Sequence, residues 1–406
     1  MSKGITWQFV VPENELAATG YEYQAGSIYS LALRYQNASQ GDQGARDAVV
    51  AQIADIVEDI GIFPITYFSL RGARAEILEC MAVEPAYGFQ RETDVVNAGV
   101  SAAGVDLCRW MFPNLHATVA TSDGVSLLEK FSDRKRLEKA IQWACSGPRP
   151  QNTKKAISAG WLYAGLRGGG AAPTNFPPMA AKAIFERFTP MNGVIWDPSA
   201  GFGGRLLGAM TSKNGYTYIG TDPEPETIEH LRQLGAIVES VTGRPYSFEV
   251  HEIGSEDYVE RCEDVDFVFT SPPYFDLEDY GQHGDQAAYQ RQSHIRYPTP
   301  EEWVQGYLRG TVRNIYRALK PGAWCVINVA DTMMAKDDRG RPTDYVDDWV
   351  EISEEEGLLL RRRGSYAVKA RPGTEHQATG RFDEMAQRVK GRRREPLLIF
   401  QKPRRY

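Results

Sequence analysis

A serine, two prolines and a tyrosine follow an apolar run, at Ser271, Pro272, Pro273 and Tyr274. The run 266–269 predicts a buried strand, and open α/β sheets bind ligands where their strands end. Prolines lack an N–H and have a fixed φ, so the turn is stiff and its carbonyls remain as acceptors. This turn suits a flat heterocycle with an exocyclic amine: the ring stacks on Tyr274, and the N–H groups reach Ser271 and the Pro272 carbonyl. A plain Pro-Pro turn with a structural tyrosine is the alternative, because the motif is short.

A glycine-rich turn follows another short apolar run, within 193–205. Glycines let the backbone pass close to a ligand without Cβ clashes. Leu206 stands where a dinucleotide-binding G-x-G-x-x-G has its third glycine, and no Gly-Lys-Ser/Thr is present, so a phosphate cradle is disfavoured. The Asp197 carboxylate suits a ligand ammonium and would repel a pyrophosphate. The candidate cofactor-binding residues of this turn are Asp197, Ser199, Ala200, Gly201 and Gly203.

Acidic residues end or follow the next two predicted strands. The strand predicted over 216–222 ends in Asp222, which is well placed to accept hydrogen bonds from ribose hydroxyls. A third strand is predicted over 248–253. Ser255, Glu256 and Asp257 follow it, and we expect them to contact an adenine ring.

Together these features resemble the class I S-adenosylmethionine-dependent methyltransferases, specifically the DNA amino-methyltransferases. The stretch 197–204 is similar to their D-P-F-x-G-x-G cofactor motif, with Ser-Ala in place of Phe-x, and 271–274 is similar to their [DNS]-P-P-[YFW] catalytic motif. The resemblance covers roughly 173–400. It implies S-adenosylmethionine as the cofactor, with Thr270 at its site, and methyl transfer to the exocyclic amine of a flipped base in double-stranded DNA. Ser271 favours N4 of cytosine over N6 of adenine, although some adenine enzymes carry serine there.

The family also has a cofactor-closing segment before a helix. Here Gly-Gly-Gly at 168–170 leads through a Pro-rich stretch to a helical pattern over 179–188. By resemblance, Asn175 and Phe176 cover the methionine end of the cofactor. An ordinary loop followed by a capped helix is the alternative.

The chain is acidic overall, with a net charge of −7, but its last part is basic. Residues 361–406 contain fourteen Lys/Arg and four Asp/Glu, a local charge of +10, so the preceding residues carry −17. Such asymmetry indicates a phosphate-binding face, and a basic hairpin over 370–395 is expected to grip the DNA backbone. A solvated basic tail is the alternative. The candidate DNA-contacting residues are Arg371, Arg381, Arg388, Lys390, Arg392, Arg393 and Arg394.

The expected fold is α/β: a Rossmann-like, seven-stranded methyltransferase sheet with helices on both faces, plus a mixed, mostly helical N-terminal domain. In the family, the last strand is antiparallel and pairs with the strand before it at one edge. The predicted domains are 1–147, for target recognition or dimerisation; 148–178, a linker and cofactor-closing segment; and 179–406, the catalytic domain. Within the first domain, helices are predicted over 46–60 and 134–144, and a strand over 63–68.

The later elements follow from the same patterns. Apolar spacing predicts helices over 301–319 and 344–358. Strands are predicted over 323–329, 359–369 and 396–402. The polar segment 275–300 is predicted to be a structureless, mobile loop that closes over the target base, since a long loop inside a compact domain is usually functional or disordered.

Composition limits the remaining options. The five cysteines form no C-x-x-C pair and the six histidines form no H-E-x-x-H, which disfavours a metal site. No apolar run reaches the roughly 18 residues of a membrane span, and the start lacks a signal-peptide core, so a cytoplasmic chain with reduced thiols is expected.

Three rival functions remain. An RNA or protein-glutamine methyltransferase uses related Asn- or Asp-Pro-Pro-Tyr turns, and the serine at Ser271 disfavours it. A non-catalytic nucleic-acid-binding protein on the same fold is disfavoured by the intact glycine turn and Asp222. A different base-modifying transferase is the third. The sequence leaves open the target base, the recognition site, a homodimer and a partner restriction enzyme of a restriction-modification pair.

Overall fold

The structure, a computed structural model, describes the following residues: 21–38, 41–84, 89–90, 95–97, 101–120, 124–146, 159–168, 173–245, 247–258, 264–275, 277–281, 284–329, 345–369 and 392–404. The chain forms two compact units. Residues 1–73 and 109–174 make up the helical unit, and residues 74–108 and 175–406 make up the sheet unit. Two of the three boundaries fall inside helices, α4 (Leu70–Ala82) and α5 (Val105–Met111), and the third lies before the helix that begins at Pro178.

The helical unit has this element order: α2 (Tyr21–Asn37), α3 (Gln43–Ile60), α6 (Asn114–Ala117), β3 (Val119–Ala120), β4 (Val125–Ser126), α7 (Leu127–Ser132), α8 (Arg134–Ser146) and α9 (Ala159–Leu166). The predicted helices 46–60 and 134–144 lie within α3 and α8. Helix α3 begins where the Asp42 carboxylate accepts the Ala45 N–H at 3.0 Å, and it ends at Gly61 with a φ of 65°. Both are usual helix-end devices.

The predicted strand at 63–68 is wrong. This segment forms an irregular turn, in which the Ile65 N–H donates to the Phe63 carbonyl at 2.9 Å. Pro64 removes one donor that a strand ladder would need. Phe63 is instead a core residue of the helical unit, with the His116 ring at 4.9 Å and the Phe131 ring at 5.5 Å.

The strands of the sheet unit are β1 (Phe89–Gln90), β2 (Val95–Asn97), β5 (Val194–Asp197), β6 (Thr217–Asp222), β7 (Phe248–Glu252), β8 (Val265–Thr270), β9 (Glu278–Asp279), β10 (Leu319–Asn328), β11 (Leu359–Lys369) and β12 (Arg392–Gln401). Its main sheet has the order β1-β2-β11-β12-β10-β8-β5-β6-β7. Strands β10, β8, β5, β6 and β7 run parallel, and β12 runs antiparallel to β10 and β11. The α/β fold with a seven-stranded sheet and an antiparallel last strand is therefore confirmed. The expected place of the last strand pair at one edge is wrong, because the short strands β2 and β1 extend the sheet beyond β11.

The last hairpin is longer than predicted. Strand β12 begins at Arg392 rather than at residue 396, because its pairing with β11 continues to Lys369 opposite Arg392. Arg392, Arg393 and Arg394 therefore lie in a strand and not in the connecting loop. The other predicted basic residues, Arg371, Arg381, Arg388 and Lys390, lie outside the described residues, as do the side chains of 392–395.

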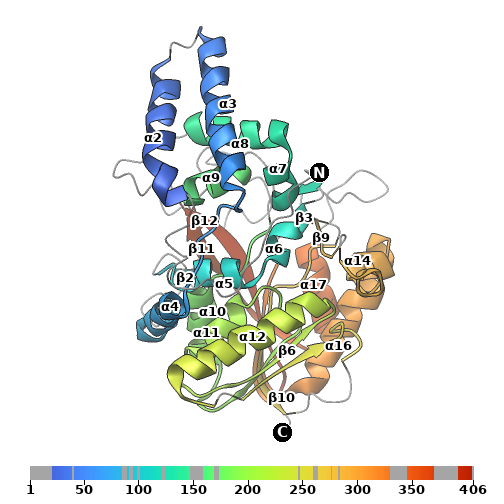
Figure 1. Ribbon diagram of the computed structural model, residues 1–406. Helices are drawn as coiled ribbons and strands as arrows, with labels where there is room; N and C mark the ends of the chain where they lie inside the picture. Colours follow the sequence, from blue (N-terminus) through green and yellow to red (C-terminus); the bar gives the residue numbers. More distant parts are fainter. Residues whose placement is uncertain are drawn as a thin grey trace. The chain divides into compact units, whose positions relative to one another are not determined.

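The helices of the sheet unit are α10 (Pro178–Phe188), α11 (Gly204–Met210), α12 (Pro225–Thr242), α13 (Gln286–Tyr289), α14 (Ser293–Arg296), α15 (Pro300–Trp303), the π-helix η4 (Val304–Leu308), α16 (Arg309–Ala318) and α17 (Tyr345–Glu355). Helices α10, α11 and α12 form one group, and α16 and α17 form another (Figure 1). The predicted helix 301–319 is thus three consecutive segments with a π turn in the middle.

Alternating side chains explain why both faces of the sheet are covered. Successive residues of a strand point to opposite faces. Phe267 and Phe269 pack against Phe185 of α10, with ring centroids at 6.1 and 5.7 Å. Val268 belongs instead to a buried cluster with residues of α15, η4, α16 and α17, such as Trp303. Strand β8 is therefore buried on both sides, and ligands can reach it at its ends.

A buried lysine links α10 to the end of α4. Lys182 is 1% exposed, and its Nζ donates to the carbonyls of Cys80, Met81 and Val83 at 2.9, 3.3 and 2.8 Å. These are carbonyls that a helix end leaves without an intrahelical partner. Burial lowers the pKa of Lys182. This contact anchors residues 80–83 on the helix that precedes the glycine turn.

The segment 275–300 is not the structureless loop that the sequence predicted. It contains α13 and α14, and the Asp285 carboxylate caps α13 by accepting the Ala287 N–H at 2.7 Å. Arg291 donates to Glu252 at 2.5 Å and to the Pro223 carbonyl at 3.1 Å. These contacts fasten the segment to the ends of β6 and β7.

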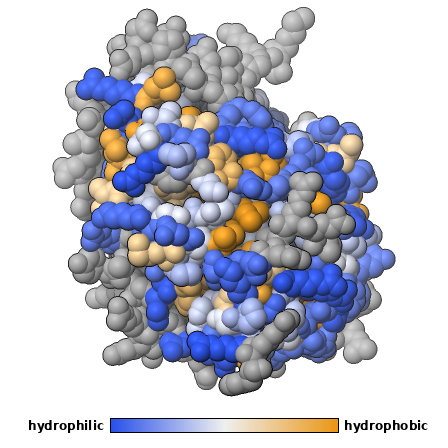
Figure 2. Space-filling model, turned by 90° about the horizontal axis from the view of Figure 1, so that it is seen from below, coloured by the Kyte–Doolittle hydropathy of each residue, from blue (hydrophilic) through white to orange (hydrophobic). Residues whose placement is uncertain are grey.

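In the view of Figure 2, most of the coloured surface is hydrophilic, and apolar residues lie in small groups between hydrophilic ones. Among the residues described, none of the helices has the length and apolar character needed to cross a bilayer.

Candidate active site

The glycine turn between β5 and α11 is shaped by backbone that other residues would not easily adopt. Gly203 has a φ of 77°, in the left-handed region that glycine tolerates best. At Gly204, an added Cβ would lie 2.0 Å from the Phe176 carbonyl oxygen. The Asn175 amide donates to the Phe202 carbonyl at 2.6 Å. The predicted cofactor-closing residues Asn175 and Phe176 thus lie directly against this turn, with the Phe176 ring buried 5.0 Å from Phe269.

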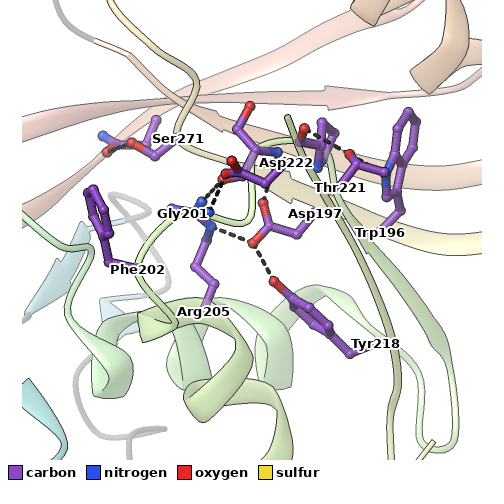
Figure 3. A network of polar contacts seen from close by, with 12 residues as sticks. Trp196, Asp197, Gly201, Phe202, Arg205, Tyr218, Thr221, Asp222 and Ser271 are labelled. Carbon is purple, nitrogen blue, oxygen red and sulfur yellow. Dashed lines mark hydrogen bonds and ion pairs between the residues drawn. The ribbon is translucent and has the colours of Figure 1, made fainter. Parts of the chain in front are cut away.

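Asp197 is the centre of a buried polar network (Figure 3). Its side chain is 0% exposed, and its Oδ2 accepts hydrogen bonds from Arg205 Nε at 2.6 Å and from the Tyr218 hydroxyl at 2.7 Å. Arg205 also donates to the Ser199 carbonyl. Burial alone would lower the pKa of Arg205, but the Asp197 carboxylate reverses this and raises it. Burial raises the pKa of Tyr218 well above its usual value, and the same carboxylate adds to the effect.

This network holds the glycine turn in place, because it joins β5, α11 and β6 through the Asp197 carboxylate. Oδ1 accepts the Ser199 N–H at a longer 3.4 Å. The predicted contact of Asp197 with a ligand ammonium remains a prediction. Oδ1 would be the atom that makes it, because its hydrogen bond within the protein is longer than those of Oδ2. Ser199 also shares a hydrogen bond with the Tyr307 hydroxyl at 3.3 Å.

Asp222 lies at the end of β6 and faces the same turn. Its two oxygens accept the N–H groups of Gly201 at 3.0 Å and Glu224 at 3.1 Å. Burial raises the pKa of Asp222 to about 6, although these two hydrogen bonds act in the opposite direction. Burial also raises the pKa of Glu224 to about 7, and the charge of Asp222 adds to it. Two carboxyl groups that change charge near neutral pH therefore stand side by side here.

The Ser-Pro-Pro-Tyr turn begins directly after β8, at the same edge of the sheet as the glycine turn. Strands β5 and β8 are parallel neighbours, with Trp196 opposite Val268. The segments that follow these two strands therefore leave the sheet at the same edge. The Ser271 hydroxyl donates to Asn328 Oδ1 at 3.2 Å. Phe275 has a φ of 46° and is held by packing against Trp303 at 6.0 Å. A bulky aromatic residue with a positive φ has a strained backbone, and such strain is often stored at functional sites.

A second aromatic residue stands near Tyr274. Tyr280 donates its hydroxyl hydrogen to Glu278, and its ring lies 6.2 Å from that of Phe202 in the glycine turn. Burial raises the pKa of Tyr280 well above its usual value, with further contributions from the charges of Glu278 and Asp222. The chain after the Ser-Pro-Pro-Tyr turn thus folds back over the glycine turn.

Two buried polar atoms near the strand ends lack a hydrogen-bond partner among the described residues. One is the hydroxyl of Thr270, which is 0% exposed at the end of β8. The other is Oε2 of Glu256, whose Oε1 accepts from Arg296 at 3.1 Å. Burial raises the pKa of Glu256 to about 7. Unpaired buried polar groups are costly, so atoms of this kind suit contacts with a ligand.

The other residues after β7 are engaged within the protein. Ser255 shares a hydrogen bond of 2.7 Å with Thr311, and Asp257 forms an ion pair with Arg296. Among the described residues, no three His, Cys, Asp or Glu side chains come together in a way that could hold a metal ion.

The structure brings most of the predicted site residues to one edge of the sheet: the glycine turn, Asp222, Thr270 and the catalytic turn. Sequence reasoning did not identify four further residues there: Arg205, Glu224, Tyr280 and Asn328. Arg205 stands next to the glycine motif and carried a visible signal, since a charged residue opens an apolar helix. Asn328 gave none beyond a polar residue near the end of an apolar run.

No family model matches this sequence, and no curated protein matches it either. Solved structures with a similar arrangement include a TehB-like SAM-dependent methyltransferase from Corynebacterium glutamicum, with 16% identity, 60% of this chain and 94% of that chain covered, and a TM-score of 0.32. A SAM-dependent O-methyltransferase from Thermotoga maritima has 12% identity, covers 57% and 68%, and has a TM-score of 0.34. The [4+2]-cyclase SpnF has 11% identity, covers 56% and 81%, and has a TM-score of 0.36. The assignment of the fold rests on the strand order above.

Proposed function

We propose that this chain is an S-adenosylmethionine-dependent methyltransferase that methylates the exocyclic amine of a flipped base in DNA, with N4 of cytosine favoured over N6 of adenine. The observation that carries the proposal is the stiff Ser-Pro-Pro-Tyr turn at the end of β8, next to the strand that leads into the glycine turn. A fold alone does not give a function, whereas these two turns have a chemistry that suits one.

The residues at the strand ends fit the proposed cofactor. Asp222 accepts two backbone N–H groups, and its oxygens retain lone pairs for the ribose hydroxyls. Oε2 of Glu256 is a buried acceptor that suits the adenine amine, and the Thr270 hydroxyl suits a polar group near the transferred methyl. Asn175 and Phe176 would cover the methionine end from their place against the glycine turn. Ser199, Ala200, Gly201 and Gly203 would follow the cofactor with their backbone.

The catalytic turn would orient the acceptor. The cofactor supplies an activated methyl group on a sulfonium. An exocyclic amine is a weak nucleophile because its lone pair is delocalised into the ring. Ser271 and the Pro272 carbonyl would accept its two hydrogens, Pro273 would keep the turn stiff, and Tyr274 would stack on the base. Correct positioning of two bound reactants can contribute about 7–11 kcal/mol in favourable cases.

The base must leave the duplex to reach this turn, which costs a few kcal/mol. Stacking on Tyr274 offsets part of this cost, at roughly 1–3 kcal/mol per base in comparable single-strand sites. The positively charged stretch 361–406 supports DNA as the partner, since its charge of +10 contrasts with the acidic remainder. The Arg and Lys residues of the 370–395 hairpin are the proposed contacts to the DNA backbone.

Methylation-sensitive long-read sequencing tests the proposal. Genomic DNA is sequenced from a methyltransferase-deficient bacterial host that expresses either the natural chain or the Ser271→Ala variant. We expect modified amines at one short recurring sequence with the natural chain and far fewer with the variant. Unmodified DNA, combined with methyl transfer to RNA or protein in the same lysate, would move the function to one of the rivals.

A further inference from the structure

The hydroxyl of Ser271 donates its hydrogen in one fixed direction in this structure, and the buried side chain of Asn328 sets this direction. Asn328 is the last residue of β10 and is 1% exposed. Its Nδ2 donates to the carbonyl of Pro396 in β12 at 2.8 Å, and its Oδ1 contacts Ser271 Oγ at 3.2 Å. The strand register brings these groups together, because Thr270 pairs with Ile327 and Asn328 pairs with Leu397.

The direction of each hydrogen bond follows from the chemistry of the three groups. The Pro396 carbonyl can only accept, so the amide must turn its NH₂ group towards it. The amide oxygen then faces Ser271, and because this oxygen can only accept, the serine hydroxyl must donate. The hydroxyl hydrogen of Ser271 is thereby directed away from the turn, and the lone pairs of Oγ remain for another donor.

We propose that Asn328 is a positioning residue that holds Ser271 Oγ as an acceptor, so that the site selects a substrate atom carrying hydrogen. This inference rests on the proposed function and deepens it. An amine satisfies the requirement, because it keeps hydrogens to donate while its lone pair faces the methyl group. A group that has only lone pairs at this place would meet an acceptor and be disfavoured. Asn328 thus acts through Ser271 and touches neither substrate nor cofactor.

A pair of cofactor analogues tests this without any DNA. Sinefungin carries an ammonium group where S-adenosylmethionine carries its methyl, and S-adenosylhomocysteine carries nothing there. The ratio of their dissociation constants, measured by calorimetry, isolates the contacts of that ammonium from those of the adenosine. We expect the natural chain to bind sinefungin more tightly by about tenfold or more, the usual worth of a hydrogen bond to a charged group.

The variants are Ser271→Ala, Asn328→Ala and the double variant. If Asn328 acts through Ser271, Asn328→Ala loses part of the sinefungin preference, and the double variant loses no more than Ser271→Ala alone. Asn328→Ser keeps a polar side chain but is too short to join Ser271 to Pro396, so it gives the same loss and serves if the alanine variant does not fold. Lys402→Met is the matched control. Lys402 directly follows β12 and donates to the carbonyls of Tyr316 and Leu319 near the start of β10, at the other end of these two strands from Asn328. Its loss should leave the sinefungin preference unchanged.

Two results overturn the inference: an Asn328→Ala variant that keeps the natural preference, or a loss that adds to that of Ser271→Ala. The outcome is separate from that of the DNA test. A coupled loss in a chain that leaves DNA unmethylated supports Asn328 and refutes the DNA substrate. Methylated DNA together with an unaltered preference refutes Asn328 alone, and a chain that binds neither analogue refutes both.

Discussion

The two turns at the edge of the sheet are built in opposite ways. At the β5 end, one carboxylate oxygen of Asp197 accepts hydrogen bonds from both Arg205 and Tyr218. The charges of Asp197 and Arg205 are therefore paired within the protein. At the β8 end, the Thr270 hydroxyl has no hydrogen-bond partner among the described residues. The Ser271 hydroxyl donates its hydrogen to Asn328 in the neighbouring strand β10. The first turn is a scaffold whose polar groups stabilise its shape. In the second, the Thr270 hydroxyl and the lone pairs of Ser271 Oγ remain open to a ligand, as the proposed function requires.

The largest effect should come from opening the closed network. In Arg205→Met, the Asp197 carboxylate stays buried without its cation, and breaking a buried pair on one side costs about 3–5 kcal/mol. Urea unfolding measures this loss. Lys213→Met is the control, because its ion pair with Glu84 is 67% and 58% exposed, and such pairs contribute about 0–1 kcal/mol. Equal losses in the two variants would show that the β5 turn does not depend on its network.

Removing an acceptor from the open turn should lower the rate and leave the fold intact. Ser271→Ala deletes one of the two groups proposed to orient the amine, and loss of one such preorganised hydrogen-bonding group usually costs about 10²–10³ in kcat. The urea midpoint and the affinity for S-adenosylhomocysteine should stay near those of the natural chain. A variant that transfers methyl groups at the natural rate would remove Ser271 from the catalytic turn.

Substitutions of Tyr274 and Asp222 should separate the two ligands. Tyr274→Ala should weaken base capture by roughly 1–3 kcal/mol, because a stacking surface is lost, while cofactor binding persists. Asp222→Ala should do the reverse. Fluorescence anisotropy with labelled DNA and calorimetry with S-adenosylhomocysteine read the two effects. If both variants lost both ligands equally, the assignment of one turn to each ligand would fail.

The smallest predicted effect is a pair of opposite pH trends around Asp222. Its folded pKa is raised to about 6, so its contribution to stability is present at low pH and is lost as the pH rises through about 6. Cofactor affinity should rise over the same range, because ribose hydroxyls donate more strongly to the ionised carboxylate. Asp222→Asn should flatten both trends near pH 6, and Glu224, with a pKa of about 7, should leave a residual trend above it. Affinity that falls as the pH rises would contradict the ribose role.

The parts of the site that could be predicted are those written in consecutive residues. An apolar run followed by glycines, or by Pro-Pro, signals a strand end and a turn, and both turns lie where the patterns placed them. The partners of these turns could not be predicted, because Arg205 and Asn328 act through packing between strands and helices that are distant in sequence. Helix α13 is different, because Asp285, a residue type that commonly caps helix starts, precedes it inside the segment predicted to be a loop.

A crystal structure with S-adenosylhomocysteine bound tests the central claim most directly. We expect the ribose on Asp222, the adenine beside Glu256, and the sulfur facing the turn of Ser271 to Tyr274 with an open path to the tyrosine ring. A cofactor bound elsewhere, or held with its sulfur turned away from that ring, would contradict the joint action of the two turns.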